Sequence, residues 1–379
     1  MKNSILKTIG IALIAVIIIA VAISLFSLFS MQQKQEVVKV GISVPLTGAV
    51  AQYGIRYMRG ANLALEDVNA NNANLDNKIE FVVEDDKCNA KEGTLVANKF
   101  CNLDKFGIQI VMCGSVAPVF APLIQENETL VFVNSIRTEG FEGKYPFLFN
   151  MFPPVDAEME KLAQHIRATE GIESVAVVYQ TDFFGETYKN KFVKHFESLG
   201  GEVVLLEGYE VSENKDYKTT LLKVKDKDIK AVVNFIAHPQ NYEPLLRQAQ
   251  EIGLELDFFS EYIVQNPVLI DTAGELADGI VYTYPYKQPE TEKFNSFASR
   301  YVQEHGEDPD PYAVNGYETI SLIGSLLEDC GNNPACMIDS LNSGKSYESI
   351  TGTIRFKDFI RDGQIYLKSI ENGSFVYLD

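Results

Sequence analysis

Small polar residues follow the ends of two predicted strands in the first half of this 379-residue chain. The apolar run 108–112 leads to Gly114 and Ser115, and the run 130–133 leads to the polar stretch 134–138. In parallel sheets, ligands bind beyond the carboxyl ends of the strands, where helix N-termini expose free amide groups. Small hydroxyl donors beside such amides suit the carboxylate of a small ligand.

Acidic and aromatic residues take the equivalent positions in the second half of the chain. They follow the runs 175–179, 231–236 and 256–259 and include Asp182, Phe183, Phe184, Ala237, His238, Glu261 and Tyr262. An acid with aromatic faces suits an ammonium group, so an α-amino acid held between both sets would satisfy each of them. The structural alternative makes Ser115 and Thr138 helix N-caps, and Phe183 and Phe184 core residues.

Enzyme chemistry finds little support in the sequence. No G-x-S-x-G motif, Walker A motif or G-x-G-x-x-G after the first strand is present. Asp85 and Asp86 are neighbours on a predicted strand, so their side chains point to opposite faces and do not share a site. His238 follows a strand without an evident serine or cysteine partner, and no C-x-x-C or Cys/His cluster occurs. We expect no catalytic residues, no metal and no cofactor.

Charge and length restrict the class of protein further. The chain carries 33 Lys and Arg against 52 Asp and Glu, a net charge of −19 that would repel nucleic acid and anionic lipid. Hydrophobic residues make up 46% of the chain, enough for a sizeable core. At about 150 residues per domain, the length allows about two domains.

Strand-like and helix-like segments alternate from residue 37 to residue 284, which predicts doubly wound parallel sheets in an α/β fold. The pattern restarts after Pro153 and Pro154, so we expect two lobes. The last hundred residues have too few strands for a third sheet and should complete both lobes, with several chain crossings that form a hinge over a cleft. The expected division is 37–153 plus 286–354 for lobe 1, and 154–285 plus 355–379 for lobe 2.

Residues 1–30 predict a transmembrane segment. Lys2 and Lys7 precede an apolar run from Ile9 to Phe29, and a helix of about 21 residues spans roughly the 30 Å of a bilayer core. The lysines place the N-terminal side in the cytoplasm and the remainder outside. We expect an uncleaved signal-anchor with a polar linker over 31–36. Cleavage near Ala20 is the alternative and would give a secreted or periplasmic protein.

The five cysteines suit an exported domain, in which disulfides persist. Cys330 and Cys336 bracket a turn-forming stretch, GNNPA, that could bring them together. Cys88 and Cys113 each follow a strand end and could pair between neighbouring strands. Cys101 is then left over, and we expect it to be buried in its helix.

Seven segments in order resemble the leucine/isoleucine/valine-binding proteins, which are type I periplasmic binding proteins of ABC importers. They are VGISVPLTGAVAQYG (40–54), RGANLALEDVN (59–69), VEDDKCNAKEGTLVANK (83–99), GKYPFLFNMFP (143–153), HPQNYEPLLRQAQEIGL (238–254), TAGELADGIVYTYPY (272–286) and EDPDPYAVNGYE (307–318). The resemblance implies an extracytoplasmic solute-binding protein whose lobes close on a small amino acid, or a related amide or acid, and whose partner is a membrane permease. A branched-chain amino acid is the first expectation. A ligand-sensing co-receptor that uses the same cleft is the alternative.

The resemblance also implies roles for individual residues, carried over position by position. In the first lobe, Tyr53 matches a cleft-wall aromatic, Gly114 and Ser115 match the pair that holds the ligand carboxylate, and Ile136 and Thr138 match a stretch that helps to bind carboxylate and ammonium. In the second lobe, Phe184 matches an aromatic lid, Glu261 or Tyr262 matches the acid that meets the ammonium, and Ala237 or His238 matches a further contact. Glu261 is favoured over Tyr262 because of its charge.

Three features depart from the family pattern. The family's disulfide begins at Cys88, but its partner position falls on Gly114, so a bridge to Cys113 needs an adjustment of one residue. Residues 116–118 (VAP) replace a serine-rich run. Arg137 replaces a small residue and would bind a second carboxylate if it points into the cleft. We favour the alternative that Arg137 points outward as a surface charge.

Overall fold

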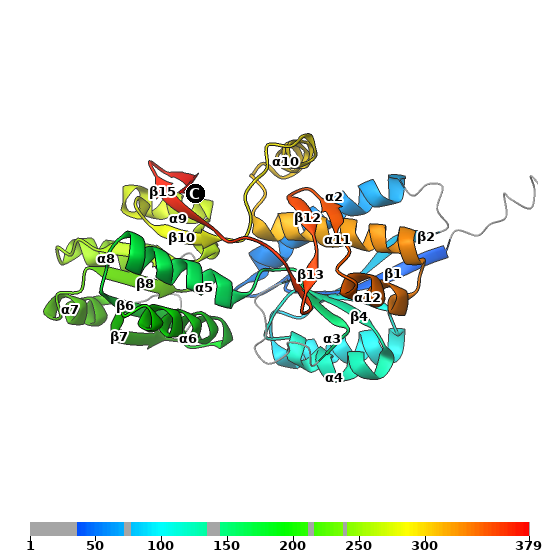
Figure 1. Cartoon of the computed structure of the whole chain (residues 1–379), viewed down its shortest axis with the longest axis horizontal. Helices are drawn as coiled ribbons and strands as arrows, with labels where there is room; N and C mark the ends of the chain where they lie inside the picture. Colours follow the sequence, from blue (N-terminus) through cyan, green and yellow to red (C-terminus); the bar gives the residue numbers. More distant parts are fainter. Residues whose placement is uncertain (1–35, 72–76, 135–144, 211–215, 238–240, 379) are drawn as a thin grey trace, which may run out of the picture.

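The computed structural model describes residues 36–71, 77–134, 145–210, 216–237 and 241–378. Two α/β lobes lie next to each other along the long axis of the molecule, and each is built on one seven-stranded sheet (Figure 1). A short hairpin of β11 (Tyr347–Ser349) and β12 (Gly352–Ile354) lies outside both sheets. The expected two-lobe α/β architecture is therefore confirmed.

Apolar, β-branched runs form the first sheet, whose strand order is β13-β14-β5-β4-β3-β1-β2. Its strands are β1 (Glu36–Val44), β2 (Asn77–Asp85), β3 (Ile108–Val111), β4 (Leu130–Val133), β5 (Leu148–Asn150), β13 (Phe356–Lys357) and β14 (Ile360–Arg361). Neighbouring strands are parallel except for β13 and β14. Every residue of β3, β4 and β5 is buried, as in parallel sheets that helices cover on both faces.

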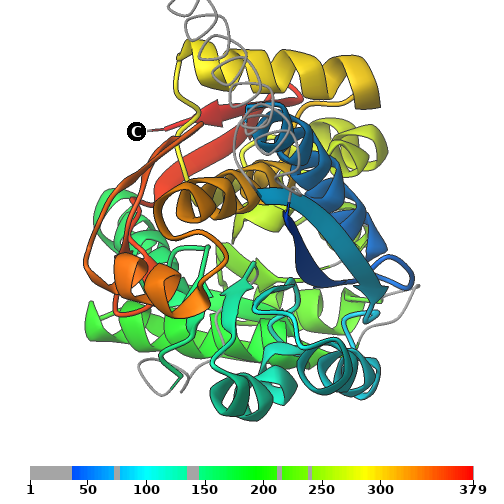
Figure 2. The same cartoon turned by 90° about the vertical axis from the view of Figure 1, so that its right-hand side faces the viewer.

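The helices of the first lobe cover both faces of this sheet, with α2 and α11 on one side and α3 and α4 on the other (Figures 1 and 2). They are α2 (Ala51–Asn71), α3 (Ala90–Asn98), the π-helical turn η2 (Lys99–Asp104), α4 (Ala117–Asn127), α10 (Glu292–His305), α11 (Pro311–Cys330) and α12 (Pro334–Asn342). Glycines let α2 and α11 touch, because a Cβ at Gly60 would lie 1.8 Å from the carbonyl oxygen of Ala313. This contact brings residues from distant parts of the sequence to one side of the lobe.

The second sheet has the strand order β16-β15-β10-β9-β8-β6-β7. Its strands are β6 (Ser174–Gln180), β7 (Glu202–Tyr209), β8 (Ala231–Phe235), β9 (Asp257–Ser260), β10 (Val281–Tyr284), β15 (Tyr366–Glu371) and β16 (Ser374–Tyr377). The strands β15 and β16 add to it in antiparallel orientation. The helices are α5 (Val155–Gln164), the π-helical turn η3 (His165–Thr169), α6 (Phe183–Ser198), α7 (Lys218–Asp226), α8 (Tyr242–Glu251) and α9 (Pro267–Ala273), with 3₁₀ turns η5 (Tyr262–Val264) and η6 (Gly274–Ala277).

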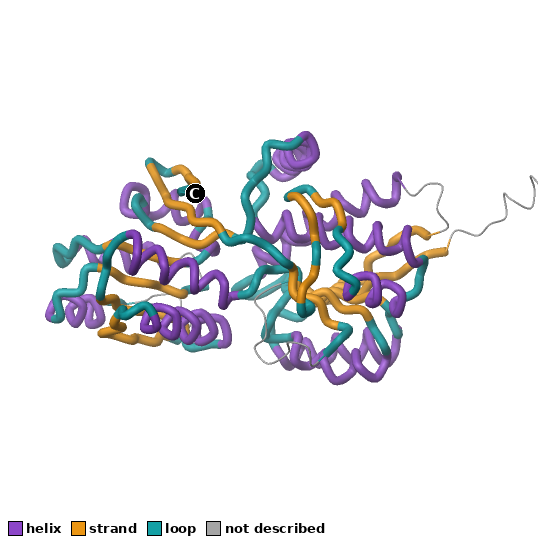
Figure 3. Tube along the Cα trace, viewed as in Figure 1, coloured by secondary structure: helices purple, strands orange, loops and turns teal. Residues whose placement is uncertain are grey.

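In the described part of the chain, three segments cross between the lobes: after β5, after β10 and after β14 (Figure 3). The expectation that the last hundred residues complete both sheets is confirmed. The expected boundary gave all residues from 355 onward to the second lobe, whereas β13 and β14 belong to the first sheet. The third crossing therefore follows Arg361, because the hairpin 356–361 pairs with β5 before the chain leaves.

Both expected disulfides are present, Cys88–Cys113 and Cys330–Cys336. The first joins the ends of two strands on either side of β1, since Cys88 follows β2 and Cys113 follows β3. Cys101 is a free, buried thiol within η2, and its Sγ lies 3.6 Å from Oε1 of Gln109.

The predicted N-terminal membrane segment and most of its linker lie outside the described residues. Within the part that is described, no helix combines the length and the apolar character needed to cross a bilayer.

Candidate functional site

A cavity of about 360 Å³ lies between the lobes, at the carboxyl ends of strands from both sheets. Its wall includes four of the residues expected to bind a ligand: Tyr53, Gly114, Ser115 and Phe184. Ala237, one of two alternatives for a further contact, also lines it. A larger cavity of about 460 Å³ is bounded by α2, α10 and α11 in the first lobe and contains none of the expected site residues.

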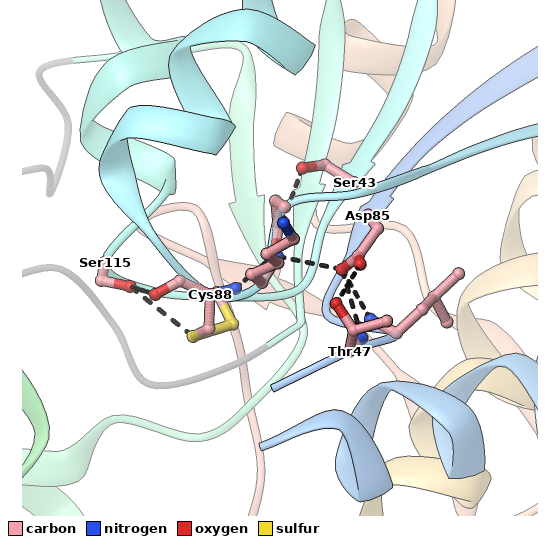
Figure 4. The surroundings of a disulfide bond; sticks show 9 residues. Ser43, Thr47, Asp85, Cys88 and Ser115 are labelled. Atoms are coloured by element: carbon pink, nitrogen blue, oxygen red, sulfur yellow. Dashed lines mark hydrogen bonds between the residues drawn. A yellow bond between two sulfur atoms is a disulfide. The ribbon is translucent and has the colours of Figure 1, made fainter. Parts of the chain in front are cut away.

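Ser115 lies beside the disulfide on the first-lobe side of the cavity (Figure 4). Its hydroxyl donates to the carbonyl oxygen of Cys88 at 3.1 Å, and Oγ lies 3.6 Å from Sγ of Cys88. It caps no helix, since α4 begins after Val116 and has no side-chain cap. The structural alternative of an N-cap is therefore wrong for Ser115. A serine hydroxyl accepts as well as donates, so it remains able to contact a ligand.

Asp85 and Asp86 build the turn that carries Cys88; Figure 4 shows Asp85 and Cys88 in this turn. Asp85 accepts from the amides of Leu46 at 2.9 Å and Lys87 at 3.0 Å. Asp86 is fully buried and accepts from the Ser43 hydroxyl at 2.7 Å and from the Cys88 amide at 2.8 Å. These bonds hold Lys87 and Cys88 at φ of 52° and 54°, in the left-handed region. The two acids therefore accept from adjacent amides of the same turn, Asp85 from Lys87 and Asp86 from Cys88.

The aromatic residues of the cavity wall come from both lobes. Tyr53 of α2 is 6% exposed, and its hydroxyl donates to the carbonyl oxygen of Ala237 in the second lobe at 2.8 Å. Its ring centroid lies 4.9 Å from that of Tyr312, the second residue of α11. Phe184 is buried against Tyr188, with ring centroids 4.8 Å apart. Phe183 is 38% exposed, so the alternative that makes it a core residue is wrong.

Asp182 explains why Phe184 faces the cavity. Its carboxylate caps α6 by accepting from the Gly185 amide at 3.0 Å, so the helix begins at Phe183. A Cβ at Gly185 would lie 2.0 Å from the carbonyl oxygen of Gln180, which only glycine avoids. The Asp-Phe-Phe-Gly sequence thus fixes the first turn of α6 tightly against the end of β6.

Glu261 is completely buried next to the cavity wall. Its Oε2 accepts from the Ile263 amide at 2.9 Å, whereas Oε1 has no hydrogen-bond partner among the described residues. Burial raises the pKa of Glu261 well above its ordinary value, the bond from Ile263 opposes this rise, and the nearby Glu158 adds to it. Glu261 interacts electrostatically with both wall residues Tyr53 and Tyr312 but does not itself line the cavity.

Tyr262 contacts the first lobe instead of the cavity. Its ring stacks on Phe152 with centroids 5.7 Å apart, and its hydroxyl lies 3.4 Å from that of Tyr312. Of the two candidates for contact with an ammonium group, Glu261 therefore has the free carboxylate oxygen, and Tyr262 takes part in an aromatic cluster between the lobes.

Ile136, Arg137, Thr138 and His238 lie outside the described residues. Reasoning from strand ends missed Tyr312, which reaches the cavity from the start of a helix that follows a chain crossing. It also missed the burial of Glu158, an acid that the sequence places in an ordinary first helical turn. Among the described residues, no group of three His, Cys, Asp or Glu side chains is arranged to hold a metal ion.

Residues 37–369 match the family model described as periplasmic binding protein. The chain belongs to this family. Its members bind solutes and are not enzymes, and they work outside the cytoplasm. The resemblance noted in the sequence is thereby confirmed, as is the expectation that the protein is not an enzyme.

Curated relatives support the same assignment. The leucine-, isoleucine-, valine-, threonine- and alanine-binding protein of Pseudomonas aeruginosa is 26% identical over 343 residues, covering 89% of this chain and 90% of the relative. The Leu/Ile/Val-binding protein of Escherichia coli (strain K12) is 28% identical over 261 residues, covering 68% and 70%.

Solved structures share the fold. A leucine-binding protein from Thermotoga maritima superposes with a TM-score of 0.79 at 18% identity, covering 90% of this chain and 98% of the other. The branched-chain amino acid substrate-binding protein of Streptococcus pneumoniae, in complex with isoleucine, gives 0.79 at 19% identity and the same coverage. A solute-binding protein from R. palustris in complex with benzoate gives 0.79 at 18% identity, covering 90% and 96%. Amino acids and an aromatic acid thus both occur as ligands on this fold.

Proposed function

We propose that this protein is the substrate-binding component of an ABC importer and binds a small amino acid between its lobes. The observation that carries this proposal is one interlobe cavity that Ser115 lines from the first lobe and Ile263 from the second. Glu261, two residues before Ile263, is buried behind that wall with its Oε1 unpartnered among the described residues. A carboxylate suits Ser115 and an ammonium suits Glu261. The ligands named for the relatives make a branched-chain amino acid the leading candidate.

The wall composition favours an aliphatic side chain. Val50, Met112 and Ile263 present apolar surface, and Tyr53 and Phe184 present ring faces. Ligand sites of this kind combine a mostly apolar lining with a few polar groups that fix orientation. In our proposal, the Ser115 hydroxyl and the amides near Gly114 bind the carboxylate, Glu261 binds the ammonium, and the apolar wall receives the side chain.

Binding acts by population shift. A ligand that contacts both lobes makes all of its contacts only when they are closed, so it favours the closed form. A permease in the membrane would then recognise that form. The lobe division that serves this motion is 37–153 plus 286–361 for the first lobe and 154–285 plus 362–379 for the second.

The N-terminal segment, in our proposal, anchors the protein in the membrane with both lobes on the extracytoplasmic side. Its apolar run from Ile9 to Phe29 is long enough to span a bilayer. N-terminal sequencing of the membrane fraction tests this: an intact Met1 is expected, and a start after Ala22 in the soluble fraction would contradict it.

Thermal unfolding of the full chain in mild detergent tests the ligand assignment. Leucine, isoleucine and valine at 100 times their dissociation constants should each stabilise the protein by about 2.7 kcal/mol. The variant Ser115→Ala should lose most of this shift, and Ser198→Ala, an exposed serine of α6 far along the helix, should keep it. A shift with benzoate but with no amino acid would contradict the amino-acid assignment and keep the solute-binding role.

A further inference from the structure

Two buried carboxyl groups lie near each other in the second lobe. Glu158, in the first turn of α5, is 1% exposed, and Glu261, between β9 and η5, is 0% exposed. Glu158 accepts from the hydroxyl of Tyr188 at 3.2 Å and from that of Thr283 at 3.5 Å. Oε1 of Glu261 has no hydrogen-bond partner among the described residues.

The surroundings of this pair contain acids and phenols. The titratable groups that interact with Glu261 are Glu158, Tyr53, Tyr188, Tyr242, Tyr262 and Tyr312, which come from α5, α2, α6, α8, η5 and α11. Within the described ranges, no lysine, arginine or histidine forms an ion pair with Glu158 or Glu261. The hydrogen bonds of both acids come from neutral groups.

Two carboxylates cannot both ionise at close range in a medium of low dielectric constant. Burial raises the pKa of Glu158 to about 8, although the bonds from Tyr188 and Thr283 oppose the rise. Burial raises the pKa of Glu261 too, and the neighbouring Glu158 adds to the effect. Without a ligand, the burial of both acids and the lack of a paired cation among the described residues favour their protonated forms.

We propose that the Glu158–Glu261 pair exchanges a proton for the ammonium group of the ligand, so that binding releases one proton to solvent. The inference rests on the proposed function. The Glu261 carboxyl loses its proton and becomes the carboxylate that faces the ligand ammonium, while Glu158 keeps its proton and its bond from Tyr188. The charge of the site is conserved, because one positive charge enters and one leaves.

This exchange selects a class of ligand. An opposite charge nearby favours the ionised carboxyl, so an ammonium group supplies the energy for deprotonation. A carboxylic acid without an ammonium group, such as benzoate, leaves the pair protonated. Affinity for amino acids should rise about tenfold per pH unit while one proton is released, and the rise should end where the ligand-free pair ionises by itself.

Isothermal titration of the full chain with leucine at pH 6.5, in phosphate and in imidazole buffer, counts the protons. We expect about one proton released per leucine in the wild type and none in Glu261→Gln. In Glu158→Gln, release at pH 6.5 should continue, because Glu158 is neutral below its pKa of about 8. In titrations repeated above pH 8, release should fade at a lower pH than in the wild type, where the ionised Glu158 raises the pKa of Glu261. Glu160→Gln, an exposed acid on the same helix, is the matched control and should behave as the wild type.

The outcomes distinguish a failure of the proton exchange from a failure of the proposed amino-acid-binding function. Leucine binding without proton release would overturn the exchange and leave the proposed function standing. Release that persists in Glu261→Gln would assign the proton to another group and overturn the role of Glu261. An unchanged pH profile in Glu158→Gln would remove Glu158 from the exchange. If circular dichroism shows that the protein is folded and no amino acid binds to it, the proposed function fails and the exchange fails with it.

Discussion

The first lobe buries Glu318 beside Arg361, whereas the second lobe buries Glu158 and Glu261 without a cationic partner among the described residues. Burial alone would raise the pKa of Glu318, but the charge of Arg361 and hydrogen bonds from Arg361, Ser349 and Thr351 outweigh it and hold the pKa below its ordinary value. The pKa of Glu158 instead rises to about 8.

This contrast separates a structural acid from a responsive one. Glu318 of α11 is ionised and ties the hairpin β11–β12 and the strand β14 to the helix. In the second lobe, burial favours the neutral forms of Glu158 and Glu261, since no cation pairs with either acid within the described structure. The same residue type thus stabilises one lobe and leaves the other able to respond to a positively charged group.

The largest effect should come from breaking the ion pair of the first lobe. Arg361→Met leaves the Glu318 carboxylate buried without its cation, which should lower the free energy of unfolding by about 3–5 kcal/mol. Urea denaturation at pH 7 measures this loss. Arg355→Met breaks the exposed pair with Asp362 and should cost less than about 1 kcal/mol. Equal losses in the two variants would contradict the contrast.

The next largest effect should be the pH dependence of the free energy of unfolding that comes from Glu158 in the second lobe. The folded protein keeps the proton of Glu158 up to about pH 8, whereas the unfolded chain releases it near 4.5. The native state therefore loses stability as pH rises between these values, by up to about 1.4 kcal/mol per unit. Glu158→Gln should remove this part of the slope. Denaturation of the wild type, Glu158→Gln and Glu160→Gln at pH 5, 6, 7 and 8 measures it, and identical slopes would refute an elevated pKa for Glu158.

The smallest effect should come from the hydroxyl that joins the lobes. Tyr53→Phe removes the 2.8 Å bond to the Ala237 carbonyl, which is worth about 0.5–1.5 kcal/mol. Leucine affinity, measured by titration calorimetry, should fall by up to about tenfold if this bond belongs to the closed form. Tyr312→Phe removes a longer contact of 3.4 Å with Tyr262 and should cost less. Tighter binding by Tyr53→Phe would show that the bond opposes closure.

Much of the fold was predictable because its strands are apolar runs between clear turn signals. The strand Leu130–Val133 has the expected limits, and the disulfide Cys88–Cys113 follows from cysteines at two strand ends. The helix α12 and the two-residue strand β14 were missed. The first is short, and the second is defined only by its pairing with β5, which leaves no local pattern.

The candidate site was predictable where it depends on strand ends and not where it depends on distant packing. Gly114 and Ser115 line the cavity because they lie in the loop just after β3. Tyr312 reaches the same cavity only because α11 packs on α2, a contact between segments about 250 residues apart. The burial of Glu158 likewise depends on α6 and β10, so its charge state has no signature in the local sequence.

The position of the hairpin 356–361 has a consequence for biosynthesis. The first sheet gains its strands β13 and β14, and the second gains β15 and β16, only from residues after 355. Neither lobe is a continuous piece of chain. Neither sheet can therefore be complete until the ribosome has made the residues after 355. Export in an unfolded form, followed by joint folding of both lobes, fits this order of synthesis better than folding of one lobe after the other.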